Sequence, residues 1–263
     1  MLQTLSDIQP LIIIGMLMVM YGAENVWPYL AKPANKKKHD IRNFILAFIS
    51  FALNGVLSVG VVSVLTLVAD HHYGLLNQLP LSTTTQVIMG VFLIDLGSYC
   101  GHILAHKVPF LWISHRVHHS DPNLDASSTL RFHPFDTIYS QGLVQCIWFF
   151  LMGISMSSFI IYGTLFLPLF ICQHSNVQFP AWFEKYARYI ISTPGWHKIH
   201  HAADQQYTDS HYGDFFTIWD RIFGTWHKVQ PEEVTYGLHE FNEDKQHSVG
   251  YLLSVPFKKL KRS

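Results

Sequence analysis

Long apolar stretches dominate the first two thirds of the chain. Three of them, at approximately residues 8–30, 44–69 and 87–105, contain almost no charged side chains. Each has about the 20 residues that a helix needs to cross the hydrocarbon core of a membrane. The pattern therefore predicts three membrane-spanning helices rather than the amphipathic helices of a soluble core.

A fourth apolar region, at approximately residues 143–172, is longer than one crossing requires. Small residues such as Gly153, Ser155 and Gly163 interrupt it and permit a bend. We therefore expect an all-α integral membrane protein with about four membrane helices, the last region forming a bent hairpin. No repeat or flexible linker divides the chain, so residues 1–263 are predicted to form a single domain.

Positive charge predicts the orientation in the membrane. The connection 32–42 holds four Lys and one Arg, whereas the connection 70–86 holds neither residue type. Lys and Arg collect in cytoplasmic loops, so the first connection should be cytoplasmic and the second should face the other side. The third helix then returns to the cytoplasm, and a basic C-terminal tail agrees with this topology: Lys258, Lys259, Lys261 and Arg262.

The two ends of the chain suggest a membrane anchor but do not select an organism. No Lys or Arg precedes the first apolar run, as one would in a cleaved signal peptide, so a retained anchor is expected. The basic ending fits a retrieval tail of the endoplasmic reticulum and fits a bacterial inner-membrane protein equally well.

Composition excludes several classes of function. Only 14% of the residues are charged, against about a quarter in soluble domains, and the 18 basic residues balance the 18 acidic ones. No basic surface for nucleic acid is therefore expected. Cys100, Cys146 and Cys172 lie in apolar stretches without CxxC spacing, which argues against disulfides and thiolate metal sites. The 17 histidines are the feature that needs an explanation.

Eight of the histidines fall into three blocks with helical spacing. The blocks are His102-x₃-His106, His115-Arg-Val-His118-His119 and His197-Lys-Ile-His200-His201. Positions i, i+3 and i+4 lie on one face of a helix, and adjacent residues are rotated by about 100°. Each block can therefore present its imidazoles in one direction, and together the blocks can serve two metal ions a few ångströms apart.

Imidazole ligands suit iron, zinc, copper and nickel, so the histidines alone do not select the metal. Eight imidazoles exceed what one ion coordinates, and structural zinc sites usually add thiolates. Two iron ions are the preferred interpretation because a metal pair at a membrane surface suits O₂ chemistry on a lipid. Zinc could replace iron in a purified form of the protein.

Three further residues are candidates for the same site. His133 and His174 are each possible metal ligands or partners of a ligand. Asp95 is a carboxylate inside an apolar helix, which is costly and often marks function. Since it lies on the helical face of His102 and His106, it could accept the N–H of a ligating imidazole. The alternative for Asp95 is a hydrogen bond between helices.

Six of the seven remaining histidines are expected to have no part in the site, and the role of His211 is left open. His71 and His72 fall in the loop predicted on the far side of the membrane, and His211 is ambiguous. The others have no grouping and are interpreted as surface residues: His39, His227, His239 and His247.

These motifs resemble the fatty acid hydroxylase superfamily, also called the sterol desaturase family, whose pattern is HxxxH, HxxHH and HxxHH between membrane helices. The similarity covers residues 90 to 226 and extends beyond the histidines. It includes Asp95-Leu-Gly-Ser-Tyr99, Pro109-Phe-Leu-Trp112, Arg131-Phe-His-Pro134, Thr193-Pro-Gly-Trp-His197, Asp209-Ser-His-Tyr-Gly213 and Trp219-Asp-Arg-Ile-Phe-Gly-Thr225. One departure is His211, where the family usually has Asn before Tyr-Gly.

The resemblance implies a membrane anchor beneath a cytosolic helical cap of approximately residues 106–140 and 173–226. It implies a two-metal centre held by the eight motif histidines, and a non-haem di-iron oxidoreductase that uses O₂ to hydroxylate or desaturate a lipid C–H bond. A separate reductase or small redox carrier is expected as electron donor, because the chain has neither a GxGxxG fingerprint nor a cysteine cluster. The alternative is a membrane metal transporter or metal-binding protein that uses the same histidines.

Overall fold

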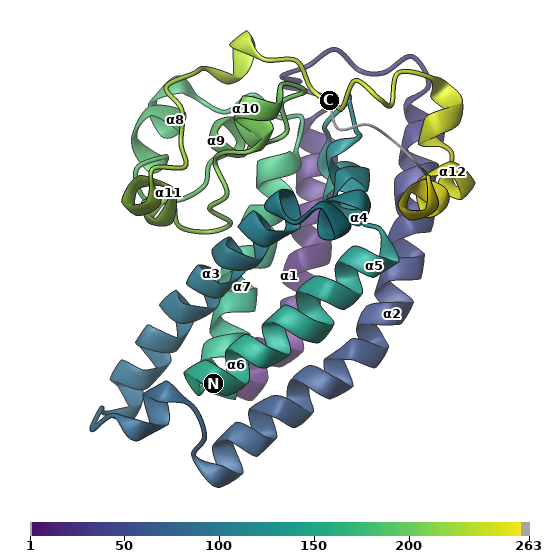
Figure 1. The fold of residues 1–263 in the computed structure, drawn as a ribbon. Helices are drawn as coiled ribbons and strands as arrows, with labels where there is room; N and C mark the ends of the chain where they lie inside the picture. The colour runs from purple at the N-terminus through teal and green to yellow at the C-terminus, as the bar shows by residue number, and fades with distance from the viewer. Residues whose placement is uncertain (1, 259–263) are drawn as a thin grey trace.

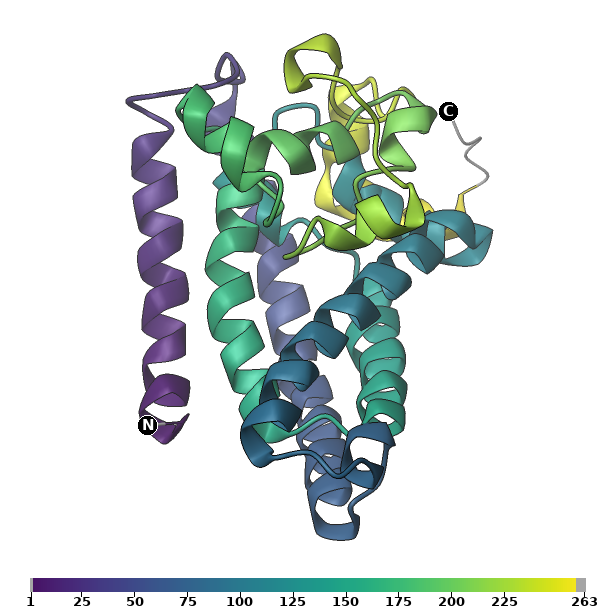
Figure 2. The ribbon, with the colours of Figure 1, turned by 90° about the vertical axis from the view of Figure 1, so that its left-hand side faces the viewer.

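The chain folds into a bundle of long helices with a layer of short helices and loops gathered at one end, as Figures 1 and 2 show from two directions. This computed structural model describes residues 2–258, so the basic tail predicted at 259–263 lies outside the described residues. Residues 2–258 contain no β-strand and only isolated bridges. The expected all-α architecture is confirmed.

Among residues 2–258, four helices are long and apolar enough to cross a membrane, as predicted. They are α1 (Leu2–Ala23), α2 (Lys36–His71), α3 (Thr83–Lys107) and α7 (Met156–His174). Large apolar side chains lie on the outside of this bundle: Phe48 and Phe51 on α2 are 74% and 78% exposed. Such surfaces are unfavourable in water and are stable against lipid. The chain is an integral membrane protein.

The fourth apolar region forms the expected hairpin, but its descending arm begins earlier than residue 143. That arm consists of α5 (Pro134–Thr137), the π-helix η3 (Ile138–Gln145) and α6 (Cys146–Met152). It leads away from the cap, and α7 returns to it (Figure 1). The turn lies at Gly153, whose φ of 74° is left-handed, and Ser155 caps α7 by accepting from Ser158 N at 3.1 Å. Both ends of the hairpin therefore reach the cap.

The hairpin turn packs against the connection between α2 and α3, which contains η1 (Leu75–Gln78). Gly74, like Gly153, has a positive φ. A Cβ built on Gly74 would lie 2.1 Å from the Gly153 nitrogen, and one on Gly153 would lie 2.9 Å from the Tyr73 carbonyl oxygen. The two backbones thus touch directly at the end of the bundle away from the cap.

The cap is formed by residues 108–133 and 175–258. Its elements are α4 (Pro109–His119), η2 (Ala126–Leu130), α8 (Ala181–Ala187), α9 (Pro194–His200), α10 (Gln205–Thr208), α11 (Ile218–Phe223), η4 (Pro231–Glu233), η5 (Asp244–His247), α12 (Val249–Ser254) and η6 (Val255–Phe257). It extends beyond residue 226, because Leu252 and Val255 share an apolar core with Trp112 of α4 and Leu46 of α2. This core fixes α4 on the end of the bundle.

The basic segment 32–42, which includes the first turns of α2, lies at the cap end of the bundle. Lys36 Nζ is 2.7 Å from Asp125 Oδ2, and Arg42 Nη1 is 2.8 Å from Asp244 Oδ1. The cap and the segment predicted to be cytoplasmic therefore share one end of the molecule. That this end faces the cytoplasm stays a prediction.

Candidate metal centre

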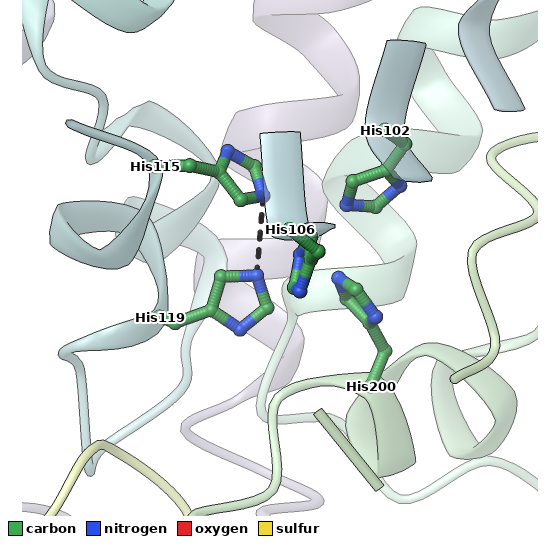
Figure 3. A group of neighbouring side chains, drawn as sticks. All are labelled: His102, His106, His115, His119 and His200. Carbon is green, nitrogen blue, oxygen red and sulfur yellow. Dashed lines mark hydrogen bonds between the residues drawn. The ribbon is translucent and has the colours of Figure 1, made fainter. Parts of the chain in front are cut away.

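Nine histidines converge beneath the cap in two neighbouring groups. The first group is His102, His106, His115, His119 and His200, drawn in Figure 3, and the second is His118, His174, His197 and His201. Within each group, one ring nitrogen per histidine lies within 4.8 Å of the others. All eight motif histidines are included, and His174 is the ninth.

Helix geometry explains how the motif residues are shared between the groups. On α4, His115 and His119 are one turn apart and face the first group, whereas His118 faces the second. At α9 the pattern is reversed, since His197 and His201 face the second group and His200 the first. Each HxxHH block therefore serves both groups, as the rotation of about 100° between adjacent residues predicts.

Local sequence fixes the starts of the two cap helices that carry these blocks. Pro109 is the first residue of α4 and Pro194 the first of α9, a position where the missing N–H costs nothing. Thr193 caps α9 by accepting from Trp196 N at 3.3 Å. At the other end of α4, the buried Arg131 donates to Val117 O at 3.1 Å and to Ser120 Oγ at 2.9 Å. These contacts hold both blocks in position.

Backbone carbonyls set the tautomer of three rings. The Nδ1 atoms of His200, His102 and His174 lie 2.8, 3.0 and 2.8 Å from the carbonyl oxygens of Ser210, Tyr212 and Phe170. A carbonyl oxygen only accepts, so in a neutral ring each Nδ1 carries the hydrogen. Each Nε2 then presents a lone pair, and His200 Nε2 is buried without a hydrogen-bond partner among the described residues. This is the arrangement of a metal-ligating histidine.

Three carboxylates surround the first group. Asp136 Oδ2 lies 3.2 Å from His115 Nδ1, while Asp209 Oδ1 and Asp214 Oδ1 each lie 3.4 Å from the Nδ1 atoms of His106 and His102, respectively. A carboxylate that accepts the N–H of an imidazole makes the other ring nitrogen a more basic metal ligand. Sequence reasoning assigned no role to these acids. Their positions in the sequence could have indicated a role. Asp136 closely follows the motif Arg131-Phe-His-Pro134, and Asp209 and Asp214 flank the motif that contains His211.

The second group has a tighter arrangement. His174 Nε2 lies 3.0 Å from His118 Nε2, 3.1 Å from His197 Nε2 and 3.2 Å from His201 Nε2. With metal–nitrogen bonds of roughly 2.0–2.1 Å, neighbouring ligand nitrogens would lie roughly 3.0–3.4 Å apart. Because His174 Nε2 presents a lone pair to three other nitrogens, a cation between them fits this donor set.

Burial keeps the cap imidazoles neutral. Burial and then the neighbouring imidazoles, which would repel one another if charged, lower the pKa of His118, His119, His197 and His201 well below the ordinary value. The pKa of His200 is lowered for the same reasons. A metal ligand must be unprotonated, so these five cap histidines suit metal binding near neutral pH.

His133 does not join either group. Its Nδ1 accepts from Phe135 N at 3.0 Å, which caps α5, and its Nε2 lies 3.2 Å from the carbonyl oxygen of Leu253. Both nitrogens are therefore used by the backbone. The expectation of a metal ligand at His133 is corrected to a structural role at the start of the hairpin.

Asp95 contacts backbone and side chains rather than a ligating imidazole. Its carboxylate accepts from Tyr162 Oη at 2.8 Å, from Trp219 Nε1 at 2.7 Å and from the backbone nitrogens of Phe215 and Phe216, both at 3.1 Å. The alternative of bonds between elements therefore describes Asp95 better. It ties α3 and α7 to the segment that supplies the Tyr212 carbonyl and Asp214 to His102.

The structure resolves the ambiguity about His211 and corrects the interpretation of His39. His211 lies outside both groups and has a left-handed backbone, with φ of 53°, a conformation in which Asn and His are enriched. His39 is not a surface residue but forms a third cluster of possible ligands with Asp40 and Asp125. The Lys36 ammonium lies 3.1 Å from Asp40 and 2.7 Å from Asp125, so a cation already occupies that cluster.

The comparisons with known proteins support the motif assignment. The chain is 33% identical over 154 residues to an ornithine lipid hydroxylase of Rhizobium tropici, covering 58% of this chain and 45% of that protein. It is 30% identical over 162 residues to human alkylglycerol monooxygenase, covering 57% of this chain and 32% of that protein. Human cholesterol 25-hydroxylase is 25% identical over 142 residues, covering 53% and 50% of the two chains.

The chain thus spans between about a third and a half of the length of these relatives. No solved structure matches it. The model of the fatty acid hydroxylase family matches residues 87–225, which contain most of α3, the hairpin, all nine histidines and α11. This chain belongs to the fatty acid hydroxylase family.

Proposed function

We propose that this protein hydroxylates a lipid at a C–H bond, using O₂ and two iron ions held by the two histidine groups. The observation that carries the proposal is the adjacency of the groups at the cap end of an apolar bundle. The three relatives compared above are named as a lipid hydroxylase, an alkylglycerol monooxygenase and a cholesterol hydroxylase, so each name describes an oxygenation reaction. A membrane lipid of one of these broad kinds is therefore the expected substrate class.

In this proposal the first group holds one ion and the second group the other. Iron bound there would supply the O₂ activation that an unactivated C–H bond requires. The protein contributes fixed ligand positions, because Ser210, Tyr212 and Phe170 orient three rings and Asp136, Asp209 and Asp214 support three. Burial of the histidines excludes water from the reacting groups. Electrons come from a separate reductase or small redox carrier.

The position of the histidines weighs against metal transport. Transport sites lie near the middle of the membrane with access from both sides. Here, both groups lie where α3 and α7 end and the cap begins, and α4 together with α9 and its C-cap residue supplies six of the nine histidines. We place the site on the cytoplasmic side because the basic segment that pairs with Asp125 and Asp244 shares this end.

Comparative lipid mass spectrometry tests the proposal. Cells that express the protein should contain a lipid that has gained one oxygen relative to cells that express His106→Ala at the same level. A lipid that has instead lost two hydrogens would make the enzyme a desaturase. Metal flux in proteoliposomes without O₂ consumption would overturn the enzyme proposal in favour of transport.

A further inference from the structure

An exposed apolar surface lies on the cap, outside the metal centre. It is formed by Tyr189, Ile190, Ile218, Ile222 and Phe223 and is called here the α11 face. The side chains of Ile190 and Ile222 are 64% and 60% exposed. Residues 189–190 and 218–223 are adjacent in space. Thr217 N donates to Ile190 O at 3.2 Å, and the Arg221 guanidinium lies 4.8 Å from the centre of the Tyr189 ring.

Helix α11 has the polarity of an element that faces lipid. Asp220 is fully buried and accepts from the backbone nitrogens of Tyr212 and Gly213 at 2.8 and 2.9 Å. Ile218 and Ile222, one turn apart, point out of the protein. A helix of a soluble cap would show the opposite pattern, with its carboxylate in water and its isoleucines buried.

The α11 face is continuous with a membrane-spanning helix. The Phe216 ring stacks on Phe92 of α3 with centroids 4.8 Å apart, and Phe223 stacks on Tyr99 of α3 at 5.5 Å. Phe92 is itself 43% exposed on the apolar surface of α3. Figures 1 and 2 agree that α11 lies on the bundle side of the cap, alongside α3. The stack of Phe92 on Phe216 therefore joins the exposed apolar surface of α3 to the segment that carries α11.

We propose that the α11 face is a membrane-contact surface, seated at the boundary of head groups and acyl chains in the leaflet on the cap side. Tyr189 and Arg221, whose guanidinium lies over the Tyr189 ring, supply an aromatic and a cationic group that this boundary favours. The bonds of Asp95 to Phe215, Phe216 and Trp219 hold the segment against α3 at this depth. The same segment supplies the Ser210 and Tyr212 carbonyls to the first histidine group.

Spin-label accessibility in liposomes tests this surface without requiring activity. In a full-length background carrying Cys100→Ala, Cys146→Ala and Cys172→Ala, a nitroxide is attached at Ile222→Cys. Gln206→Cys on α10, an exposed polar position of the cap, is the aqueous control, and Phe51→Cys on α2 is the lipid control. Ile218→Cys, one turn from Ile222, provides a second reporting position if the first variant does not fold.

The label at residue 222 should collide with O₂ more often than with a water-soluble nickel chelate, as at residue 51 and unlike residue 206. Collision rates equal to those at residue 206 would overturn the proposal. Spin–spin broadening that grows with the labelled fraction would also overturn it, because it would place a second copy of the chain on this face. Neither outcome depends on whether the protein oxidises a lipid.

Discussion

The Nε2 atom of His118 lies 3.0 Å from the Nε2 atom of His174, although 56 residues separate them in the chain. His118 belongs to a motif, and His174 does not. Their contact is made by the returning arm of the hairpin, which ends at His174 and delivers it to the second group. The hairpin is therefore part of the candidate metal site.

Replacing His174 should remove one of two metals. We expect His174→Ala to bind about one metal ion per chain where the unmodified protein binds about two, because the second group loses the nitrogen that its other three surround. Elemental analysis of the purified protein measures this ratio. His133→Ala is the matched control and should retain both ions, since both of its ring nitrogens bind backbone. Equal metal loss in the two variants would contradict the assignment.

Asp136 should strengthen metal binding without being a ligand. Asp136→Ala removes the carboxylate 3.2 Å from His115 Nδ1, so affinity at the first group should fall by roughly 10–100-fold. Competition with a chelator of known affinity measures the change. Asp136→Asn keeps an acceptor but loses the charge and should recover part of the affinity. Unchanged chelator competition in Asp136→Ala would show that this carboxylate does not support the site.

Acid should destabilise the metal-free protein. The pKa values of His118, His119, His197, His200 and His201 are lowered in the folded chain, first by burial, whereas they return to about 6.5 on unfolding. Below pH of about 6.5 the unfolded chain therefore binds more protons, and the free energy of unfolding falls as the pH drops. Each group contributes up to about 1.4 kcal/mol per pH unit. Thermal denaturation after metal removal, between pH 7.5 and 5.5, checks this, and a pH-independent midpoint would contradict it.

Replacing Asp95 should primarily lower the free energy of unfolding rather than alter the chemistry directly. Asp95→Leu leaves the backbone nitrogens of Phe215 and Phe216 and the Trp219 indole without their acceptor. The expected loss in the free energy of unfolding is roughly 3–5 kcal/mol, together with weaker metal binding at the first group. Unfolding in detergent, followed by circular dichroism, measures the first effect. Asp95→Asn, which retains an acceptor oxygen, should lose less.

The turn of the hairpin should accept only glycine. Gly153→Ala places a Cβ 2.9 Å from the Tyr73 carbonyl oxygen at a φ of 74°, so it should cost at least about 1–2 kcal/mol in unfolding free energy. Gly60→Ala is the matched control, because nothing lies within 4 Å of the added methyl group and the helix gains propensity. Equal melting temperatures for the two variants would argue against the tight turn.

Periodicity could predict the membrane helices and the division of the histidine blocks, since both follow from local geometry. It could not show that His174 joins the site and that His133 does not. Each residue lies in an aromatic segment, and only the tertiary fold decides that one ring meets other imidazoles while the other caps a helix. Asp95 posed the same difficulty. Its position on the helical face of His102 indicated a bond to that imidazole, but the Phe215 N–H that donates to its carboxylate lies 120 residues further along the chain. The environment of His39 was hidden in the same way, because two of its charged partners, Asp121 and Asp125, lie far away in the sequence.

Two pairs of bonded neighbours straddle the histidine groups. His118 and His119 face different groups, as do His200 and His201, and the ring centroids are 5.5 Å apart in both pairs. The covalent link between adjacent residues therefore limits the distance between the two histidine groups, once on α4 and once at the end of α9. The peptide backbone sets this limit on their spacing, because in both blocks it links a ligand of one group to its neighbour in the other.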